Sequence, residues 1–294
     1  MRKYDERHVS VLASEVVEFL VTRVDGVYVD CTVGEGGHTL QIVSLYDKAK
    51  VVALDKDREV LRLAERNLEG YLDRVKLVHS DFVEVGEVLE SLGYQKVDGF
   101  LLDLGVSTYQ LKAEGRGFSF NRDELLDMRM DPTSSSPTAR EIVNSYSEEE
   151  LARIIKLYGE EPFAKRIARS IVRSRPIDST LQLVEAIKRA IPPKSRFSRK
   201  RHFATRTFQA LRIEVNRELE KLERVLNVIP DFLRPGGRVV VISFHSLEDR
   251  IVKNVFREDS RLILITKKPV TPSETELRSN PRARSARMRV AERC

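Results

Sequence analysis

Short apolar runs alternate with amphipathic segments along the first third of the chain. Residues 10–21 show helical periodicity, and four apolar runs follow at Val27–Cys31, Lys50–Leu54, Val75–Val78 and Val97–Leu102. Continuous apolar runs of this length, separated by helical patterns, are typical of parallel strands joined by crossover helices. The alternation predicts an α/β fold built on a parallel sheet.

The last third of the chain continues the pattern. Arg238–Ser243 reads RVVVIS and predicts a fifth strand, and Leu233-Arg-Pro-Gly-Gly237 before it predicts a turn that ends the preceding helix. Further apolar runs at Arg261–Ile265 and Ala286–Ala291 predict two more strands. The last of these alternates, so we interpret it as a terminal antiparallel strand.

The interval between the fourth and fifth predicted strands is far longer than one crossover unit, which takes about 30 residues. Its pattern is helical: Ser147-Glu-Glu-Glu150 is a capping box, Thr180 is a candidate cap, and Thr207–Leu226 carries an apolar stripe predicting one long helix. We therefore predict an inserted all-helical domain for substrate recognition. The predicted boundaries are 106–212 for the insertion and 1–105 with 213–294 for the core.

The first predicted strand leads into a glycine-rich turn, Asp30-Cys-Thr-Val-Gly34-Glu-Gly36-Gly37-His38, and a helical pattern follows. Glycines let a backbone turn sharply and approach a ligand closely, and a helix N-terminus presents N–H groups to it. Gly34, Gly36, Gly37 and His38 are therefore candidate cofactor contacts. A tight strand-to-helix turn without a ligand is the alternative interpretation.

Acidic residues end three consecutive predicted strands, at Asp55, Asp81 and Asp103. Ligands of open parallel sheets bind at this edge, and an acidic side chain after the second strand can accept both hydroxyls of a ribose. Phe82 is a candidate to cover an adenine ring. Each residue alone is equally typical of a helix cap or a solvated turn. A dehydrogenase is less consistent with the sequence, because the turn lacks the third spaced glycine of a dinucleotide motif.

Composition narrows the class of protein. The 294 residues include 51 Lys and Arg against 45 Asp and Glu, a formal charge of +6, which suggests a polyanionic partner where the charge is clustered. The two cysteines, Cys31 and Cys294, give neither a disulfide framework nor metal-ligand spacing. We see no signal peptide and no run long enough to span a bilayer. We expect a cytoplasmic protein with no membrane partner.

Four stretches spread over the whole chain resemble the MraW family, the ribosomal RNA small-subunit methyltransferases H, which methylate N4 of a cytidine in the decoding region of 16S rRNA. The stretches are Leu101-Leu-Asp-Leu-Gly-Val-Ser107, Arg116-Gly-Phe-Ser-Phe120 with Leu126-Asp-Met-Arg-Met-Asp131, Arg206-Thr-Phe-Gln-Ala-Leu-Arg-Ile-Glu-Val-Asn216, and Ile242-Ser-Phe-His-Ser-Leu-Glu-Asp-Arg-Ile-Val252. The resemblance implies a Rossmann-like sheet of an S-adenosylmethionine (SAM) dependent methyltransferase with an inserted helical domain. It also implies SAM as methyl donor without a metal, and 16S rRNA within the assembled small subunit as partner, with no obligate protein partner.

The resemblance implies a set of SAM contacts, most of which the residue patterns had already indicated. Gln110 comes from the family alone. The implied contacts are Gly36, Gly37, His38, Asp55, Phe82, Asp103 and Gln110. The chain departs from the family pattern at three places. Thr108-Tyr109 stands where the family often has Ser-Pro, Lys112 where an acidic residue is common, and Phe203 where Pro is usual.

Methylation of a cytosine amine needs help from the enzyme, because the nitrogen lone pair is delocalised into the ring. An acceptor hydrogen-bonded to the amine frees that pair as the new bond forms. Asp103 is our candidate catalytic residue, with the carbonyl of Leu104 as the alternative. Phe118, Phe120 and Phe244 are candidates to stack on the flipped base, although a core role is as typical for each.

Two more residues are candidate RNA contacts. Arg116 begins one of the family motifs, and His245 follows the fifth strand on the expected ligand edge. A histidine capping a helix is the alternative for His245, and we assign it no acid or base role.

Two basic segments predict an RNA surface. Lys194–Arg206 contains six basic residues, Lys200 and Arg201 among them, with interleaved phenylalanines and no acidic residue. Arg278–Arg293 adds six arginines against one acidic residue. A solvated loop is the alternative for the first segment, and a terminal strand for part of the second.

Two alternative functions remain open from the sequence. One is an amino-methyltransferase acting on another nucleic acid or on protein. The other is an assembly factor that binds SAM and RNA without needing to turn over. Asp103→Asn separates a catalyst from a binding factor, because only the catalyst requires the carboxylate.

Overall fold

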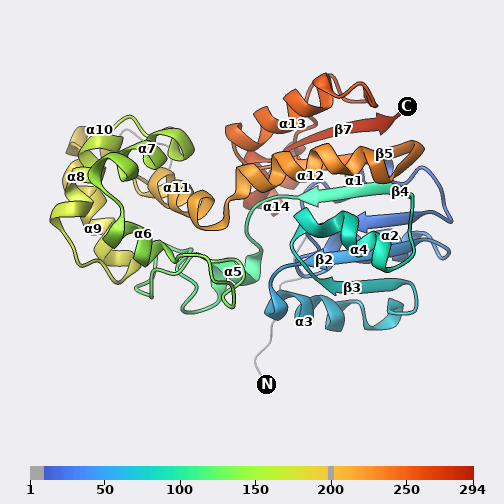
Figure 1. The fold of residues 1–294 in the computed structure, drawn as a ribbon, viewed down its shortest axis with the longest axis horizontal. Helices are drawn as coiled ribbons and strands as arrows, with labels where there is room; N and C mark the ends of the chain where they lie inside the picture. Colours follow the sequence, from blue (N-terminus) through green and yellow to red (C-terminus); the bar gives the residue numbers. More distant parts are fainter. Residues whose placement is uncertain (1–9, 198–201) are drawn as a thin grey trace. The chain divides into compact units, whose positions relative to one another are not determined.

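The computed structural model describes residues 10–197 and 202–294, which form two compact units (Figure 1). Unit 1 comprises the chain up to Ser107 together with Leu219–Cys294, and unit 2 is Thr108–Glu218. The second unit is therefore an insertion between two parts of the first.

Unit 1 is built on a seven-stranded sheet with the order β3-β2-β1-β4-β5-β7-β6. The strands β1 to β5 pair in parallel, whereas β7 runs antiparallel to both β5 and β6. The strands are β1 Val27–Asp30, β2 Lys50–Asp55, β3 Val75–His79, β4 Val97–Asp103, β5 Leu233–Ser243, β6 Leu262–Leu264 and β7 Arg287–Arg293. The predicted Rossmann-like α/β fold and its antiparallel last strand are confirmed.

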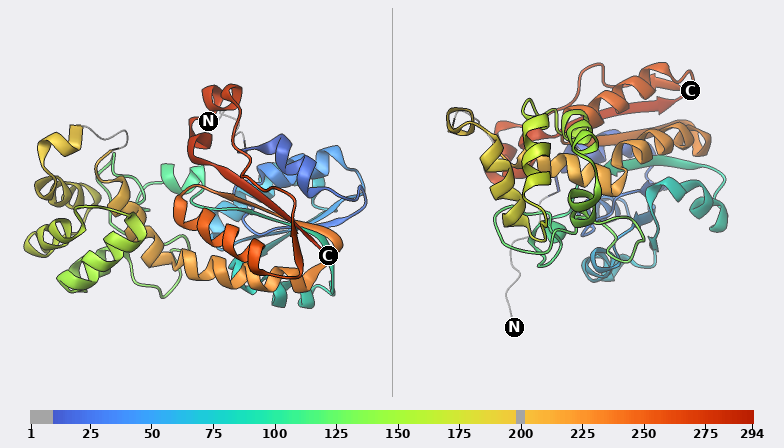
Figure 2. Two further views of the ribbon diagram at one scale, coloured as in Figure 1. Left: turned by 90° about the horizontal axis from the view of Figure 1, so that it is seen from above. Right: turned by 60° about the vertical axis from the view of Figure 1, so that its left-hand side comes forward.

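Helices cover both faces of this sheet (Figures 1 and 2). Successive residues of a strand point to opposite faces, so Tyr28 and Leu101 belong to one apolar cluster while Val29 and Leu102 belong to the other. The first cluster includes α1 and α2, and the second includes α4, α12 and α13. The helices and turns of unit 1 are α1 Ala13–Leu20, α2 Gly37–Leu45, α3 Arg58–Asn67, η1 Glu69–Tyr71, η2 Phe82–Glu84, α4 Val85–Ser91, α12 Glu218–Phe232, α13 Ser246–Glu258, α14 Glu274–Ser279 and η3 Pro281–Ser285.

The segment before the fifth strand differs from the prediction. Helix α12 ends at Phe232, beyond the predicted end at Leu226, and the Leu-Arg-Pro-Gly-Gly segment predicted as a turn already belongs to β5. The register jumps from Val97 opposite Leu233 to Gly99 opposite Arg238, so the residues between bulge out of the ladder. Proline and glycine tolerate this, because a bulged residue does not need a ladder hydrogen bond.

Unit 2 consists of helices joined by loops, as predicted. The helices are α5 Thr108–Lys112, α6 Ala139–Ser145, α7 Glu148–Gly159, α8 Ala164–Arg173, α9 Thr180–Ala190, α10 Pro193–Phe197 and α11 Thr205–Asn216. Ser147 and Glu150 form the predicted capping box of α7. The cap of α9 is Ser179 rather than Thr180, whose hydroxyl instead donates to the carbonyl of Arg122 and accepts from Glu124 N–H.

The long helix predicted at Thr207–Leu226 is in fact two helices, α11 and α12. The chain leaves the helical conformation at Arg217, which has φ 53°, a left-handed value rare for a residue other than glycine. The preceding Asn216 uses its amide to bond the backbone at Met128 and Met130. The apolar stripe continues across the break, so periodicity alone could not reveal it.

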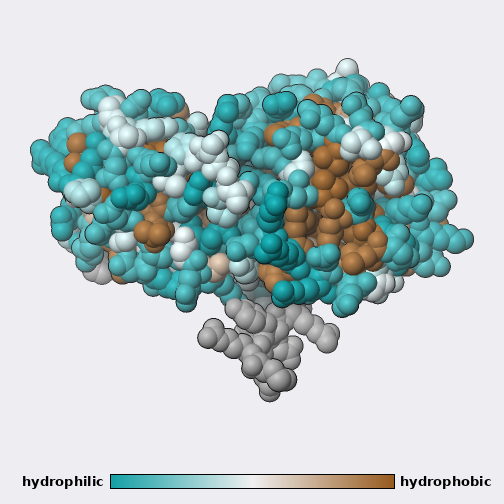
Figure 3. Space-filling model, turned by 60° about the horizontal axis from the view of Figure 1, so that its bottom comes forward, coloured by the Kyte–Doolittle hydropathy of each residue, from teal (hydrophilic) through white to brown (hydrophobic). Residues whose placement is uncertain are grey.

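Polar residues (teal) make up most of the face that Figure 3 shows. Figure 3 also shows apolar residues (brown) gathered on one part of this face. Unit 1 has exposed large apolar side chains, Leu45 and Leu72 among them. Among residues 10–197 and 202–294, no helix is both long enough and apolar enough to cross a bilayer.

Candidate functional site

Four aspartates lie at or just after the carboxyl ends of parallel strands, on one edge of the sheet. Asp30, Asp55 and Asp103 are the last residues of β1, β2 and β4, and Asp81 follows β3 closely. Parallel strands bring their carboxyl ends to the same edge, which is where ligands of such sheets bind. Asp30, which was not among the predicted acidic residues, ends the first strand in the same way.

The glycine-rich turn lies between β1 and α2. Gly34 and Gly36 have φ of +54° and +89°, values that a side chain would strain. Gly37 is closely packed, because a Cβ there would lie 2.1 Å from the Oγ of Ser10, which would then have to move. The turn is joined to the second strand, since Gly34 N–H donates to Asp55 Oδ2 at 3.0 Å.

Asp55 is held in place by two backbone donors. Besides Gly34, the N–H of Asp57 donates to its Oδ1 at 3.0 Å. Burial raises the pKa of this carboxyl to about 6, even though the two N–H groups act in the opposite direction. An ionised carboxylate has about four lone-pair sites, so both oxygens keep capacity for further donors such as ribose hydroxyls.

A buried group of ionisable side chains joins α2 to β1 and β4. His38 Nε2 lies 3.5 Å from Asp103 Oδ2, and their side chains are 7% and 23% exposed. Asp30 is also buried and accepts from Thr39 Oγ1 at 2.8 Å and from Thr32 N–H at 3.2 Å. Burial alone would lower the pKa of His38, but the nearby acidic groups, Asp103 foremost, outweigh it and raise that pKa.

Asp103 keeps one oxygen available. Its N–H donates to Thr32 Oγ1 at 2.6 Å, which fixes the backbone at the strand end. Its Oδ1 is buried and has no hydrogen-bond partner among the described residues. A buried carboxylate oxygen without a donor is costly, so this atom is set up for a donor that comes with a ligand.

Asp81 and Phe82 follow the third strand. Asp81 caps the turn η2 through Val83 N–H and pairs with Lys221 at 2.6 Å and with Lys56 at 3.9 Å. Burial would raise the pKa of Asp81, but the two ammonium groups lower it below its usual value. The partly buried ring of Phe82 packs against the apolar cluster of the sheet. Asp81 therefore serves as a cap and ion-pair partner.

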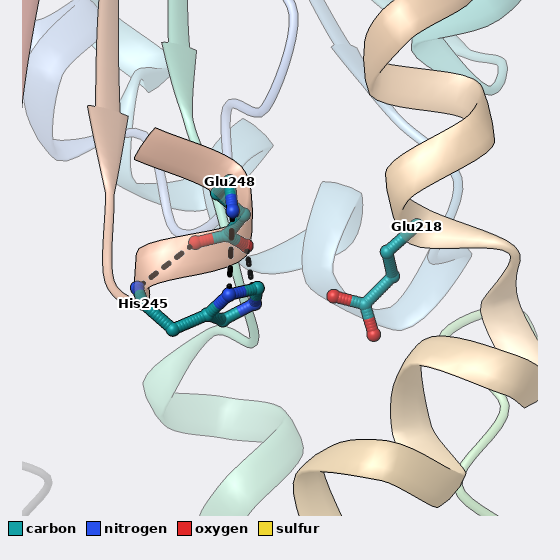
Figure 4. A group of neighbouring side chains, drawn as sticks. All are labelled: Glu218, His245 and Glu248. Carbon is teal, nitrogen blue, oxygen red and sulfur yellow. Dashed lines mark hydrogen bonds and ion pairs between the residues drawn. The ribbon is translucent and has the colours of Figure 1, made fainter. Parts of the chain in front are cut away.

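The end of β5 places Phe244 and His245 at the same edge. The ring of Phe244 lies 3.7 Å from the Cβ position of Gly105, two residues after Asp103 in the sequence. His245 caps α13: its Nδ1 accepts from Glu248 N–H at 3.4 Å, and its Nε2 lies 3.2 Å from Glu248 Oε1 (Figure 4). The capping alternative for His245 is thus what the structure shows, and its contact with RNA stays a prediction.

The C-terminal arginines are partly used within unit 1. Arg287 and Arg289 pair with Asp249 at 3.1 and 2.6 Å, and these contacts lower the pKa of Asp249 despite its burial. Arg282, on η3, is only partly exposed, which lowers its pKa, while the charges of Glu35 and Asp103 oppose that shift. One cation of this segment therefore lies within electrostatic range of the candidate catalytic residue.

The predicted site residues in unit 2 have internal partners. Gln110 is buried and its Nε2 lies 3.5 Å from the carbonyl of Met130, to which Arg116 also donates at 2.8 Å. Phe118 is buried. The contacts of these three residues with SAM or RNA stay predictions.

Phe120 belongs to an aromatic group of unit 2. Its ring stacks on His202 with centroids 4.6 Å apart and planes 9° apart, and meets Phe208 edge-on at 5.5 Å. His202 also contacts Phe203, at 4.2 Å between ring centroids. Lys200 and Arg201 lie outside the described residues, so their role stays a prediction.

Sequence reasoning missed the polar residues that support the site. These are Asp30, Thr32 and Thr39, with Lys221 beside Asp81. The strand-end position of Asp30 could have identified it. The two threonines carry no pattern that distinguishes them from ordinary turn and helix residues.

Comparison with known proteins gives matches along almost the entire chain. A model of the MraW methylase family matches residues 5–294. Proteins named ribosomal RNA small subunit methyltransferase H are similar to this chain: that of Thermosipho africanus is 57% identical over 293 residues, covering 100% of both chains. That of Kosmotoga olearia is 58% identical, covering 99% of each chain, and that of Clostridioides difficile is 47% identical, covering 97% of this chain and 98% of the other.

Solved structures give weaker likenesses. TrmN from Thermus thermophilus aligns with a TM-score of 0.46 at 13% identity, covering 96% of this chain and 48% of that one. An rRNA methylase from Streptococcus thermophilus aligns with a TM-score of 0.41 at 12% identity, covering 96% and 93%. At such scores neither structure supports an argument about this chain.

The sequence matches and the sheet agree with the resemblance seen in the four motifs. The predicted Rossmann-like sheet of a SAM-dependent methyltransferase is confirmed. This chain belongs to the MraW methylase family.

Proposed function

We propose that this protein transfers a methyl group from SAM to N4 of a cytidine in the decoding region of small-subunit ribosomal RNA. The relatives' name, ribosomal RNA small subunit methyltransferase H, supports the substrate class. The observation that carries the chemistry is the buried Asp103 Oδ1, which has no donor among the described residues and lies beside the glycine-rich turn.

The residues at the strand ends fit SAM. When bound, SAM supplies a methyl group activated by its sulfonium. Asp55 would accept the ribose hydroxyls, and Phe82 would lie against the adenine. Gly34 and Gly36 would let the turn approach the methionyl part. Each oxygen of Asp55 accepts one backbone donor, from Gly34 or Asp57, and keeps capacity for one of the ribose hydroxyls.

Asp103 would assist the acceptor amine. A carboxylate oxygen that accepts from the cytosine N–H raises the electron density on nitrogen and then holds the proton that the nitrogen must lose. This interaction strengthens as positive charge develops on nitrogen, so it favours the transition state over the ground state. The chemistry as proposed needs no metal, because the methyl group is already activated.

The best-placed aromatic residue to hold the base is Phe244. It follows β5 directly and lies against Gly105, in the same unit as Asp103. Phe118 and Phe120 belong to unit 2, where Phe118 is buried and Phe120 already stacks on His202. We propose that unit 2 contributes RNA recognition through its basic and aromatic residues, and that the substrate is the assembled small subunit in the cytoplasm.

The experiment is transfer of labelled methyl from SAM to small ribosomal subunits that lack the modification. Nuclease digestion and mass spectrometry then place the label. We expect label on N4 of a single decoding-region cytidine, lost by at least ~100-fold in Asp103→Asn, which removes a charged acceptor. Exposed Asp73, changed to Asn, is the matched control.

Either of two results would contradict the proposal. Label on a different base or on protein would move the activity to another acceptor. Measurable SAM binding with no transfer to any subunit would favour the binding-factor alternative.

A further inference from the structure

His38 and Asp103 come from distant parts of the sequence and meet at the end of the sheet. We propose that His38 is a positioning residue whose imidazolium holds Asp103 Oδ2, so that Oδ1 faces the methyl acceptor. This role rests on the proposed function, in which Asp103 accepts from the cytosine amine. It differs from a contact of the glycine-rich turn with SAM, because here the side chain of His38 acts on another side chain.

The geometry sets one ring nitrogen against one carboxylate oxygen. His38 is the second residue of α2, and its Nε2 lies 3.5 Å from Oδ2 of Asp103, the last residue of β4. Both ring nitrogens of His38 are buried and lack a hydrogen bond within the described part of the chain. Burying a polar ring without hydrogen bonds costs free energy, and an opposite charge nearby offsets that cost when the ring is protonated. Asp103, 3.5 Å away, supplies that charge.

The surrounding charges favour the protonated ring. Asp103 on β4, Asp30 on β1 and Glu276 on α14 face His38, and their charges raise the pKa of the ring against the effect of burial. Arg282 on η3 is a cation within electrostatic range of Asp103. Carboxylates from three elements therefore favour the protonated form of one imidazole.

A second contact fixes the backbone of Asp103. Its backbone N–H donates to Thr32 Oγ1, and the adjacent Asp30 is held by Thr32 N–H and Thr39 Oγ1. With the backbone fixed by Thr32 and Oδ2 fixed by His38, the direction of Oδ1 is determined. Catalytic groups held in this way do not lose rotational freedom when the substrate binds.

The first test needs neither SAM nor RNA. Histidine ring nitrogens of ¹⁵N-labelled protein are titrated by NMR in the natural sequence and in Asp103→Asn. We expect the pKa of His38 to lie above the ordinary value of about 6.5 and to fall by roughly one unit or more in Asp103→Asn, because an opposite charge has been removed. A pKa that does not respond to Asp103→Asn would overturn the pairing.

The second test measures methyl transfer by His38→Gln, with His79→Gln as control. His79 is an exposed histidine of unit 1 that contacts Arg58 and the backbone of Lys56. We expect kcat of His38→Gln to fall roughly 10- to 100-fold while KM for SAM changes less than about threefold, since misplacing a reacting group acts on the chemical step. A variant with normal kcat, or one with only a raised KM, would overturn the positioning role.

The pH profile adds a readout that a purely structural role would not move. Because the imidazolium is the active form, kcat should fall as the pH rises through the pKa of His38, and this limb should be absent in His38→Gln. If the natural protein transfers no methyl group, the proposed function fails, and the NMR titration still decides whether His38 and Asp103 form a pair.

Discussion

Buried polar side chains serve different purposes in the two units. In unit 1, Asp55 and Asp103 lie at strand ends and keep acceptor capacity that the fold does not use. In unit 2, Arg116 and Asn216 are more deeply buried than these two residues, and they form hydrogen bonds with backbone groups of residues 128–130. Burial and a family motif therefore do not by themselves identify a ligand site, and what distinguishes Asp55 and Asp103 from Arg116 and Asn216 is unused acceptor capacity at a strand end.

The largest effect that we expect from a substitution is on SAM binding by unit 1. Asp55→Asn should weaken SAM binding by about 100-fold, because charge-assisted hydrogen bonds contribute about 1.5–3 kcal/mol each and the amide has one acceptor oxygen instead of two. Isothermal titration calorimetry measures the affinity, and exposed Asp73, changed to Asn, is the control. An unchanged affinity would show that Asp55 only holds Gly34 and Asp57.

The corresponding change in unit 2 should affect stability and leave SAM binding unchanged. Asn216→Ala removes the acceptor of Met130 N–H and the donor to Met128 C=O, both buried. We expect the free energy of unfolding to fall by about 2–3 kcal/mol, since unsatisfied buried groups cost about 1–3 kcal/mol each. Urea denaturation measures this loss, with exposed Asn121→Ala as control. Loss of SAM affinity in a folded Asn216→Ala variant would contradict the purely structural role of Asn216.

A smaller effect follows from the pKa of Asp55, which burial raises to about 6. Below this pH the carboxyl is protonated and accepts fewer hydrogen bonds, so SAM affinity should fall about tenfold between pH 7 and pH 5. The folded-state pKa lies above the unfolded value, so ionising Asp55 makes folding less favourable as the pH rises through about 6. SAM affinity should change less with pH in Asp55→Asn than in the natural protein. If it changes equally in both proteins, another group causes the pH dependence.

The smallest effect concerns a helix cap in unit 2. Ser179→Ala should lower the free energy of unfolding by about 1 kcal/mol, because Ser179 accepts from Gln182 N–H at the start of α9. Thermal unfolding measures the loss, and Thr180→Ser, which keeps the hydroxyl that bonds Arg122 and Glu124, is the comparison. An unchanged free energy of unfolding in Ser179→Ala would contradict Ser179 as the cap of α9.

The sheet could be predicted because its strands are continuous apolar runs with clear ends. Val97–Leu102, for example, was predicted one residue short of the observed β4, which ends at Asp103. The break at Arg217 could not be predicted, because the apolar stripe continues through it and arginine is no signal for a left-handed residue. The bulge in β5 depends on pairing with β4, which local sequence does not encode.

The candidate site was predictable to the extent that it follows strand ends. Asp55 and Asp103 were found because parallel strands share an edge. The pairing of His38 with Asp103 was not, because the two residues belong to separate motifs and meet only through the order of the strands. For Gly37, the sequence indicated a ligand contact, whereas the structure adds the close approach of Ser10 as a reason for glycine.

The position of the insertion also affects how the protein is made. Strand β4 is buried along nearly its whole length between β1 and β5, but β5 begins only after unit 2 has been synthesised. At about 5–20 residues per second, translation of the insertion takes on the order of ten seconds, during which β4 is an unpaired apolar edge. We expect nascent chains stalled within unit 2 to bind chaperones that recognise apolar strands, and chains stalled after β5 has left the ribosome not to bind them.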